Sequence, residues 1–176
     1  MALKKKKATK KSAKKIIVLE TNKGNISIEL LSDLAPKHCE RILQLSNDKF
    51  FDDVVFHRVI DGFMAQTGDG QFGSLKNGLQ SDRVGMGGSD LPDLEAEFTS
   101  EPFVRGIVGM ARSQNPNSAN SQFFIMLEES PHLNNQYTAW GRVVKGMDVV
   151  DKIKKGDEFD NGKVDNPDFI KRVKIV

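Results

Sequence analysis

Short apolar runs separated by polar, turn-forming stretches dominate this sequence, and most of the runs have the length of a β-strand. In the clearest case Ile26, Ile28 and Leu30 alternate with polar residues, which is typical of a strand with one buried face. Residues 22–25 just before it supply the turn chemistry of a hairpin. The runs together predict strands near residues 16–20, 26–31, 54–59, 63–67, 107–111, 122–127, 138–144 and 169–176.

Two segments follow a helical pattern instead. Ser32 or Asp33 can cap a helix that carries Pro36 in its first turn and ends near Asn47. Residues 146–153 predict a second, shorter helix.

Residues 68–91 contain seven glycines and little apolar periodicity, so we expect them to run over the surface. Short strands with two helices and no internal repeat favour one mainly β domain, either a closed antiparallel barrel or a sandwich. Closure would leave no strand edge exposed. No apolar run has the length needed to span a membrane.

Candidate core positions follow from the same patterns. Trp140 lies in an alternating strand, and Cys39, the single cysteine, lies beside the apolar stripe of the first helix. A catalytic thiolate is the alternative for Cys39, but no motif flanks it. We expect His57 to face inward and make structural hydrogen bonds rather than act as a base, and the histidines lack the spacing of metal ligands. The other expected core residues are Phe50, Phe51, Ile170, Val173 and Ile175.

Charge is distributed unevenly along the chain. Residues 1–15 contain eight Lys and no acid, whereas residues 16–176 carry 18 Lys and Arg against 24 Asp and Glu. This predicts a disordered Lys-rich tail, residues 1–15, before a single folded domain, residues 16–176. The tail is either a solvated arm or a loose attachment to nucleic acid. It lacks the apolar core of a secretory signal, which favours the cytoplasm; the periplasm applies if a native signal has been removed.

The most informative chemistry lies in residues 56–66, which have the sequence FHRVIDGFMAQ. The segment places a permanent cation, Arg58, near an apolar pair, Phe63 and Met64, and an amide, Gln66. It supplies no nucleophile and no pair of carboxylates. Such a site can grip and polarise a substrate but is poorly equipped to cut one, which indicates chemistry that makes and breaks no covalent bond.

A second segment, residues 109–127, has a polar, turn-rich middle followed by an apolar strand. Phe123 and Phe124 begin that strand, so one is expected to face the core and the other the opposite side. An aromatic side chain directed outward beside a polar loop is a candidate binding surface.

These segments resemble the signatures of a known family. FHRVI at 56–60 followed by GFMAQTGD at 62–69 is similar to the signature of the cyclophilin family of peptidyl-prolyl cis–trans isomerases. NSANSQFFI at 117–125 resembles the second signature of that family, and GRVVKGM at 141–147 the segment after it. The resemblance covers nearly all of residues 16–176. It implies a closed eight-stranded antiparallel barrel capped by two α-helices, with the active site on the outside of the barrel.

The resemblance also implies a role for each matching position. Arg58 would be catalytic, donating a hydrogen bond to the proline nitrogen while the peptide bond is twisted. Gln66 and the backbone near Arg112 would bind the substrate main chain. No cofactor is needed, because no electrons, groups or protons are transferred. The proline pocket would consist of Phe63, Met64, Phe124 and Leu133, and the rest of the groove of Gly85, Ala111, Gln122 and Tyr137.

Three positions differ from the best-known eukaryotic pattern of the family. His132 stands in place of a tryptophan, Tyr137 in place of a histidine and Arg112 in place of a common asparagine. Similar replacements of the first two occur in bacterial-type cyclophilins, which this chain resembles. Because the tryptophan is associated with cyclosporin binding in the family, we expect weak cyclosporin affinity with isomerase activity retained.

The leading hypothesis is an active isomerase for X–Pro bonds in proline-containing peptides and in unfolded or flexible protein segments. One alternative is a proline-peptide-binding module or chaperone whose isomerase activity is incidental. Another is an RNA-associated protein held by the Lys-rich tail. A monomer is the default expectation.

Overall fold

The computed structural model describes residues 14–176, so most of the predicted tail, with its proposed nucleic-acid attachment, lies outside the described residues. The last residues of that tail are part of the folded domain. The backbone N–H of Leu30 donates to the carbonyl of Lys15 at 2.9 Å, and Lys14 Nζ lies 3.4 Å from Glu29 Oε1. The sheet therefore begins its contacts slightly before the expected boundary at residue 16.

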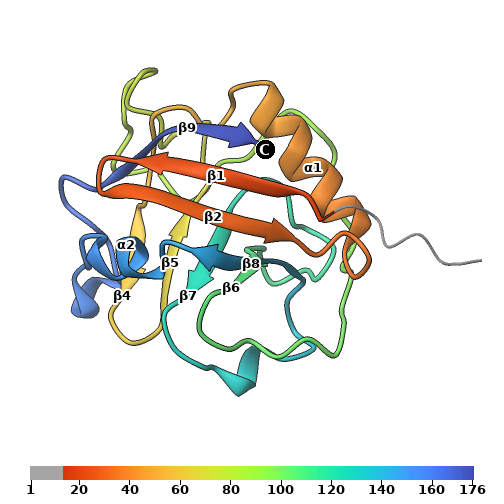
Figure 1. Ribbon diagram of the computed structural model, residues 1–176. Helices are drawn as coiled ribbons and strands as arrows, with labels where there is room; N and C mark the ends of the chain where they lie inside the picture. The colour runs from red at the N-terminus through yellow and green to blue at the C-terminus, as the bar shows by residue number, and fades with distance from the viewer. Residues whose placement is uncertain (1–13) are drawn as a thin grey trace, which may run out of the picture.

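One antiparallel sheet of nine strands builds the domain, in the order β3-β9-β1-β2-β8-β6-β7-β5-β4 (Figure 1). The predicted hairpin pairs the first two strands, with Thr21 opposite Gly24 at the turn. The strands are β1 (Ile16–Thr21), β2 (Gly24–Leu30), β3 (Val54–Val55), β4 (Arg58–Ile60), β5 (Met64–Thr67), β6 (Ile107–Met110), β7 (Phe123–Met126), β8 (Ala139–Lys145) and β9 (Phe169–Ile175).

The two edge strands, β3 and β4, are consecutive in the chain and separated only by Phe56 and His57. β3 pairs with β9 at one edge of the sheet, and β4 pairs with β5 at the other. The sheet is therefore curled, so that its two edges lie next to each other in the chain. At the break the Phe56 N–H donates to the carbonyl of Asp168, while the Val59 N–H donates to that of Gly162. This break divides the single strand predicted at 54–59, and it gives nine strands instead of eight. The mainly β antiparallel prediction is confirmed.

Two α-helices pack on the curled sheet, α1 (Pro36–Asn47) and α2 (Met147–Lys152). α1 contacts β8 and β9, and α2 contacts β2; Figure 1 shows them on opposite sides of the molecule. Both lie where the sequence predicts helices. Two 3₁₀ turns, η1 (Pro131–Leu133) and η2 (Glu158–Asp160), lie near the site described below. Within residues 14–176 no helix has the length and apolar character to cross a membrane.

The predicted cap of α1 is wrong. Ala35, rather than Ser32 or Asp33, occupies the N-cap position, and its side chain makes no capping bond. The backbone N–H groups of Lys37 and His38 instead donate to the carboxylate of Glu97, at 3.3 and 2.9 Å. A carboxylate from a distant loop thus satisfies the first turn and complements the helix dipole.

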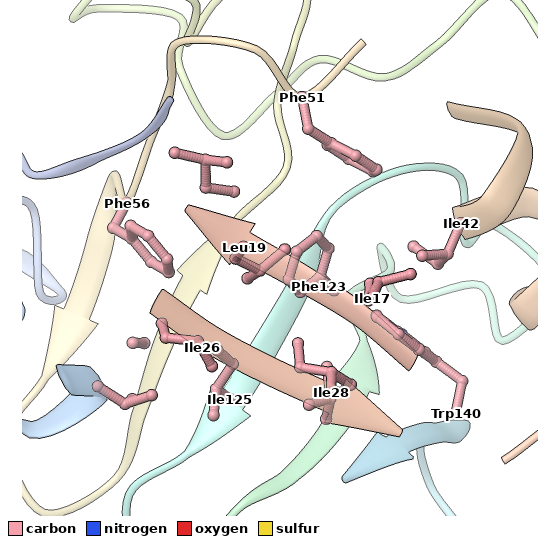
Figure 2. Packing of buried hydrophobic residues seen from close by; sticks show 14 of the residues in the cluster. Ile17, Leu19, Ile26, Ile28, Ile42, Phe51, Phe56, Phe123, Ile125 and Trp140 are labelled. Atoms are coloured by element: carbon pink, nitrogen blue, oxygen red, sulfur yellow. The ribbon is translucent and has the colours of Figure 1, made fainter. Parts of the chain in front are cut away.

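The interior of the curled sheet is filled by aliphatic and aromatic side chains, as Figure 2 shows. The Phe123 ring meets the rings of Phe51 and Trp140 edge to face, with centroids 5.6 and 5.3 Å apart. The labelled members of this core are Ile17, Leu19, Ile26, Ile28, Ile42, Phe51, Phe56, Phe123, Ile125 and Trp140.

Most of the predicted core residues are buried. Trp140, Phe51, Cys39 and Ile170 are within the core, and Phe50 and Val173 pack against it. Burial raises the pKa of the Cys39 thiol to about 11, so it stays protonated at neutral pH, which disfavours a catalytic thiolate. Ile175 was expected in the core and is 41% exposed, because it lies at the exposed C-terminal end of β9, next to Val176, which is 78% exposed.

Candidate active site

The register of the outer strands brings the candidate residues into one row across the sheet. Arg58 on β4 lies opposite Gln66 on β5, Gln66 lies opposite Phe124 on β7, and Phe124 lies opposite Gly109 on β6. Side chains at opposite positions of paired strands point to the same face. A cation, an amide and an aromatic ring therefore lie side by side on the outer face of the sheet.

The row includes Gly109, where there is no room for a side chain. A Cβ at this position would lie 2.6 Å from ring atoms of both Phe103 and Phe124. The two rings are stacked, with centroids 5.9 Å apart and planes at 28°. Phe124 packs in this space on the outer face and Phe123 lies in the interior core, so the two rings point to opposite faces, as the alternation predicted.

Phe124 forms one wall of an open cavity of about 240 Å³. The cavity has an apolar floor and a polar rim, which suits a compact apolar group attached to a polar main chain. Every residue predicted for the proline pocket lines it. The lining residues are Arg58, Phe63, Met64, Gln66, Ala111, Arg112, Phe124, Leu133, Tyr137 and Asn161.

Tyr137 and Arg112 form the far side of this cavity. The Tyr137 ring meets Phe124 edge to face at 5.7 Å. Above it the Arg112 guanidinium carbon lies 4.5 Å from the Tyr137 ring centroid, in cation–π contact. Arg112 also donates to the carbonyl of Gln136. Arg112 therefore packs on the Tyr137 ring, and the Tyr137 ring packs against Phe124.

A second hollow of about 270 Å³ adjoins the first, because the two share Gln66, Ala111 and Arg112. The remaining predicted groove residues, Gly85 and Gln122, line this hollow. The two cavities together form one continuous groove. The additional lining residues, which the sequence did not predict, are Met86, Gly87, Ser113, Ser118, Asn120 and Ser121.

A buried carboxylate holds the loop that borders the second hollow. Asp69 is fully buried. Its Oδ1 accepts the backbone N–H groups of Gln71 and Phe72, and its Oδ2 those of Gly85 and Gly87, at 2.8 to 3.1 Å. A carboxylate satisfied by several N–H donors fixes their relative positions. Asp69 thereby fixes the conformation of part of the segment 68–91, which was expected to run over the surface.

A chain of side-chain hydrogen bonds connects the two cavities. Arg58 Nη1 donates to Gln66 Oε1 at 3.1 Å, Gln66 Nε2 donates to Gln122 Oε1 at 3.0 Å, and Gln122 Nε2 donates to the carbonyls of Gly85 and Gly87. Because arginine can only donate, it fixes which way each amide points. Among the described residues, only one of the two N–H groups of the Gln66 amide has an acceptor.

Arg58 and His57 are neighbours in the chain but differ in charge at neutral pH. Burial lowers the pKa of the Arg58 guanidinium, opposed weakly by Tyr137, and arginine nevertheless stays protonated. Burial also lowers the pKa of His57 to about 4; Asp69 opposes this shift and the Arg58 charge adds to it. At neutral pH the site therefore holds a charged donor beside a neutral, buried imidazole.

The sequence did not single out Asn161, which lines the first cavity and contacts Arg58. Only the Asn-Gly pair at 161–162 hints at special backbone geometry, and that signal marks a turn rather than a site. His132, at the position of the expected difference from the eukaryotic pattern, is on η1 and its ring lies 6.0 Å from that of Phe63. In the described part of the chain, no cluster of three or more His, Cys, Asp or Glu side chains could hold a metal ion.

Comparison with known proteins identifies the family to which this fold and groove belong. The family model described as cyclophilin type peptidyl-prolyl cis-trans isomerase/CLD matches residues 16–175. The chain belongs to the cyclophilin family of peptidyl-prolyl cis–trans isomerases. A Brucella suis protein named "Probable peptidyl-prolyl cis-trans isomerase" is 59% identical over 159 residues, which cover 90% of this chain and 81% of that protein.

Solved structures agree with this assignment. A cyclophilin-type isomerase of Cryptosporidium parvum, crystallised in the presence of the dipeptide Ala-Pro, has a TM-score of 0.78 and 28% identity, covering 92% of this chain and 98% of its own. A cyclophilin of Hirschia baltica has a TM-score of 0.75 and 26% identity, covering 90% and 73%. The curled antiparallel sheet described above is thus the fold of this family.

Proposed function

We propose that this cyclophilin accelerates rotation about X–Pro peptide bonds by aiming Arg58 at the proline nitrogen while an apolar pocket holds the ring. The proposal rests mainly on the N–H groups of Arg58 that remain available as donors at the rim of the cavity. Of the five N–H groups of a guanidinium, Nε and one on each terminal nitrogen are bonded within the protein. The other N–H on each terminal nitrogen has no acceptor among residues 14–176 and is available to a substrate.

The energetics of the reaction suit such a donor. Amide resonance creates a barrier of about 18–20 kcal/mol to rotation, while cis and trans X–Pro forms differ by only about 1 kcal/mol. Halfway through the rotation the resonance is lost, and the proline nitrogen gains a lone pair that accepts a hydrogen bond. A donor used only in that state lowers the barrier without stabilising the ground state equally. By analogy with oxyanion donors, its contribution is about 3–4 kcal/mol, or 10²–10³ in rate.

The apolar cavity contributes in a different way. Burying the methylenes of a proline ring against Phe63, Met64, Phe124 and Leu133 stabilises the complex by about 0.8 kcal/mol per methylene. This term is similar for the planar and the twisted peptide, so it favours binding more than rate. The pocket contributes to the rate by holding the proline ring still while the preceding residue rotates. The low polarity also favours the twisted amide, which is less charge-separated than the planar one.

The proposed substrates are proline-containing peptides and unfolded or flexible protein segments. The Cryptosporidium parvum relative was crystallised in the presence of a proline dipeptide, and here the adjoining hollow extends the proline pocket into a groove. Gln66, with one amide N–H still available, would donate to the substrate main chain. The cytoplasmic location stays a prediction.

The test measures isomerisation rate and peptide affinity on the same proteins. Arg58→Ala is expected to lower kcat by 10²–10³ with little change in affinity, because the lost bond forms only in the twisted state. Arg142→Ala is the matched control, since Arg142 is an exposed arginine of β8 whose partner is Glu29, and it should keep full activity. If Arg58→Ala folds normally and retains its rate, the catalytic proposal is wrong. If it loses affinity and rate equally, Arg58 only binds, as in a peptide-binding module.

A further inference from the structure

Asn161 holds the Arg58 side chain from the side opposite Gln66. Arg58 Nε donates to the Asn161 backbone carbonyl at 3.0 Å, and Arg58 Nη2 donates to Asn161 Oδ1 at 3.0 Å. Arg58 Nη1 donates to Gln66 Oε1. Three acceptors therefore surround the guanidinium, and two of them come from a single residue located 103 positions later in the chain.

The backbone around Asn161 is built to keep these two acceptors in place. Asn161 follows η2 with φ of 53°, in the left-handed region that asparagine tolerates better than most residues. The Gly162 N–H donates to the carbonyl of Asp157, and the Asp157 side chain accepts from the Phe159 N–H. These bonds close residues 157–162 into a compact turn.

The same turn is fastened to the strand that carries Arg58. The Val59 N–H donates to the carbonyl of Gly162 at 2.9 Å, and the Gly156 N–H donates to the carbonyl of Val59 at 2.8 Å. A Cβ at Gly162 would lie 2.5 Å from Ile60 Cγ1, which shows how closely the turn approaches β4. Arg58 and its acceptors thus share one rigid frame.

We propose that Asn161 is a positioning residue that orients the free N–H groups of Arg58 toward the substrate nitrogen. A long arginine side chain has many rotamers, so without these acceptors the guanidinium would point toward the substrate for only part of the time. Both acceptors of Asn161 are neutral. They fix the guanidinium plane without cancelling the charge that strengthens its remaining hydrogen bonds. This inference rests on the proposed role of Arg58.

Asn161→Gly is the informative variant, because glycine adopts the left-handed conformation and keeps the backbone carbonyl, while the side chain and with it the acceptor Oδ1 are removed. We expect kcat to fall about tenfold, the size of one hydrogen bond to a charged group, with KM nearly unchanged. Asn166→Gly is the matched control: it is another exposed asparagine in the left-handed region, with φ of 49°, and it lines neither cavity. The control should keep full activity, and both variants should unfold at similar temperatures.

A double-mutant cycle separates positioning from a general structural effect. In an Arg58→Ala background, Asn161→Gly should cause no further loss of kcat, because the group it orients is gone. A further tenfold loss in that background would overturn the inference, since Asn161 would then act by another route. Unchanged kcat in Asn161→Gly, with a large loss in Arg58→Ala, would also overturn it while leaving the proposed function intact. Full activity in Arg58→Ala would remove the proposed function itself.

Discussion

His57, buried next to Arg58, makes the stability of this fold sensitive to mild acid. Its pKa falls from 6.5 to about 4 on folding, chiefly because burial disfavours the charged imidazole. Between these values the unfolded chain binds a proton that the folded protein does not, so stability falls as the pH is lowered. At about 1.4 kcal/mol per pKa unit, the folded protein should lose ~3 kcal/mol from this group between pH 8 and pH 4. That is a large part of a typical domain's stability.

Urea unfolding at pH 8 and pH 4 measures this quantity directly. The difference between the two pH values should be about 3 kcal/mol smaller in His57→Gln than in the wild type. The variant is compared with itself across pH, so a constant packing defect cancels. His132→Gln is the matched control, because His132 is exposed and should preserve the wild-type difference. An equal pH dependence in His57→Gln and wild type would refute the reasoning. His38, whose pKa burial also lowers despite Glu97, should account for part of the dependence that remains.

Two other predictions concern the walls of the cavity. Gly109→Ala should displace the Phe124 ring, lower the free energy of unfolding by about 1–3 kcal/mol and reduce kcat/KM, as measured by chemical unfolding and an isomerisation assay; unchanged activity would show that the ring position is not critical. His132→Trp should increase cyclosporin affinity in calorimetry without raising isomerase activity, whereas tight binding by the wild type would contradict the expected weak affinity.

Local patterns were sufficient for most of the fold, whereas the candidate residues of the groove came from the resemblance to the cyclophilin family. The alternation at 26–30 predicted the buried face of that strand, and the order of Phe123 and Phe124 predicted that their rings point to opposite faces, because successive side chains of a strand alternate. Arg58 and Gln66 were recognisable because they lie within one continuous motif. Strand pairing then explains why they meet Phe124, which lies in another motif of the same family pattern.

Features that depend on contacts between distant segments were missed. The first turn of α1 is satisfied by Glu97, 59 residues beyond His38, so no local cap was needed. The strand at 54–59 breaks because its two halves pair with β9 and β5, two partners that the local pattern does not reveal. Asn161 approaches Arg58 only because the turn at 157–162 is fastened to β4. None of these pairings leaves a periodic signal in the sequence.

The central claim is that Arg58 lowers the barrier on the enzyme and does not merely hold the peptide. The most direct measurement is the cis–trans exchange rate of a proline peptide bound at saturation, followed by NMR for the wild type and Arg58→Ala at equal occupancy. The account predicts that exchange of the bound peptide slows by about 10²–10³ in the variant. An equally fast exchange in a folded, fully occupied Arg58→Ala protein would contradict it.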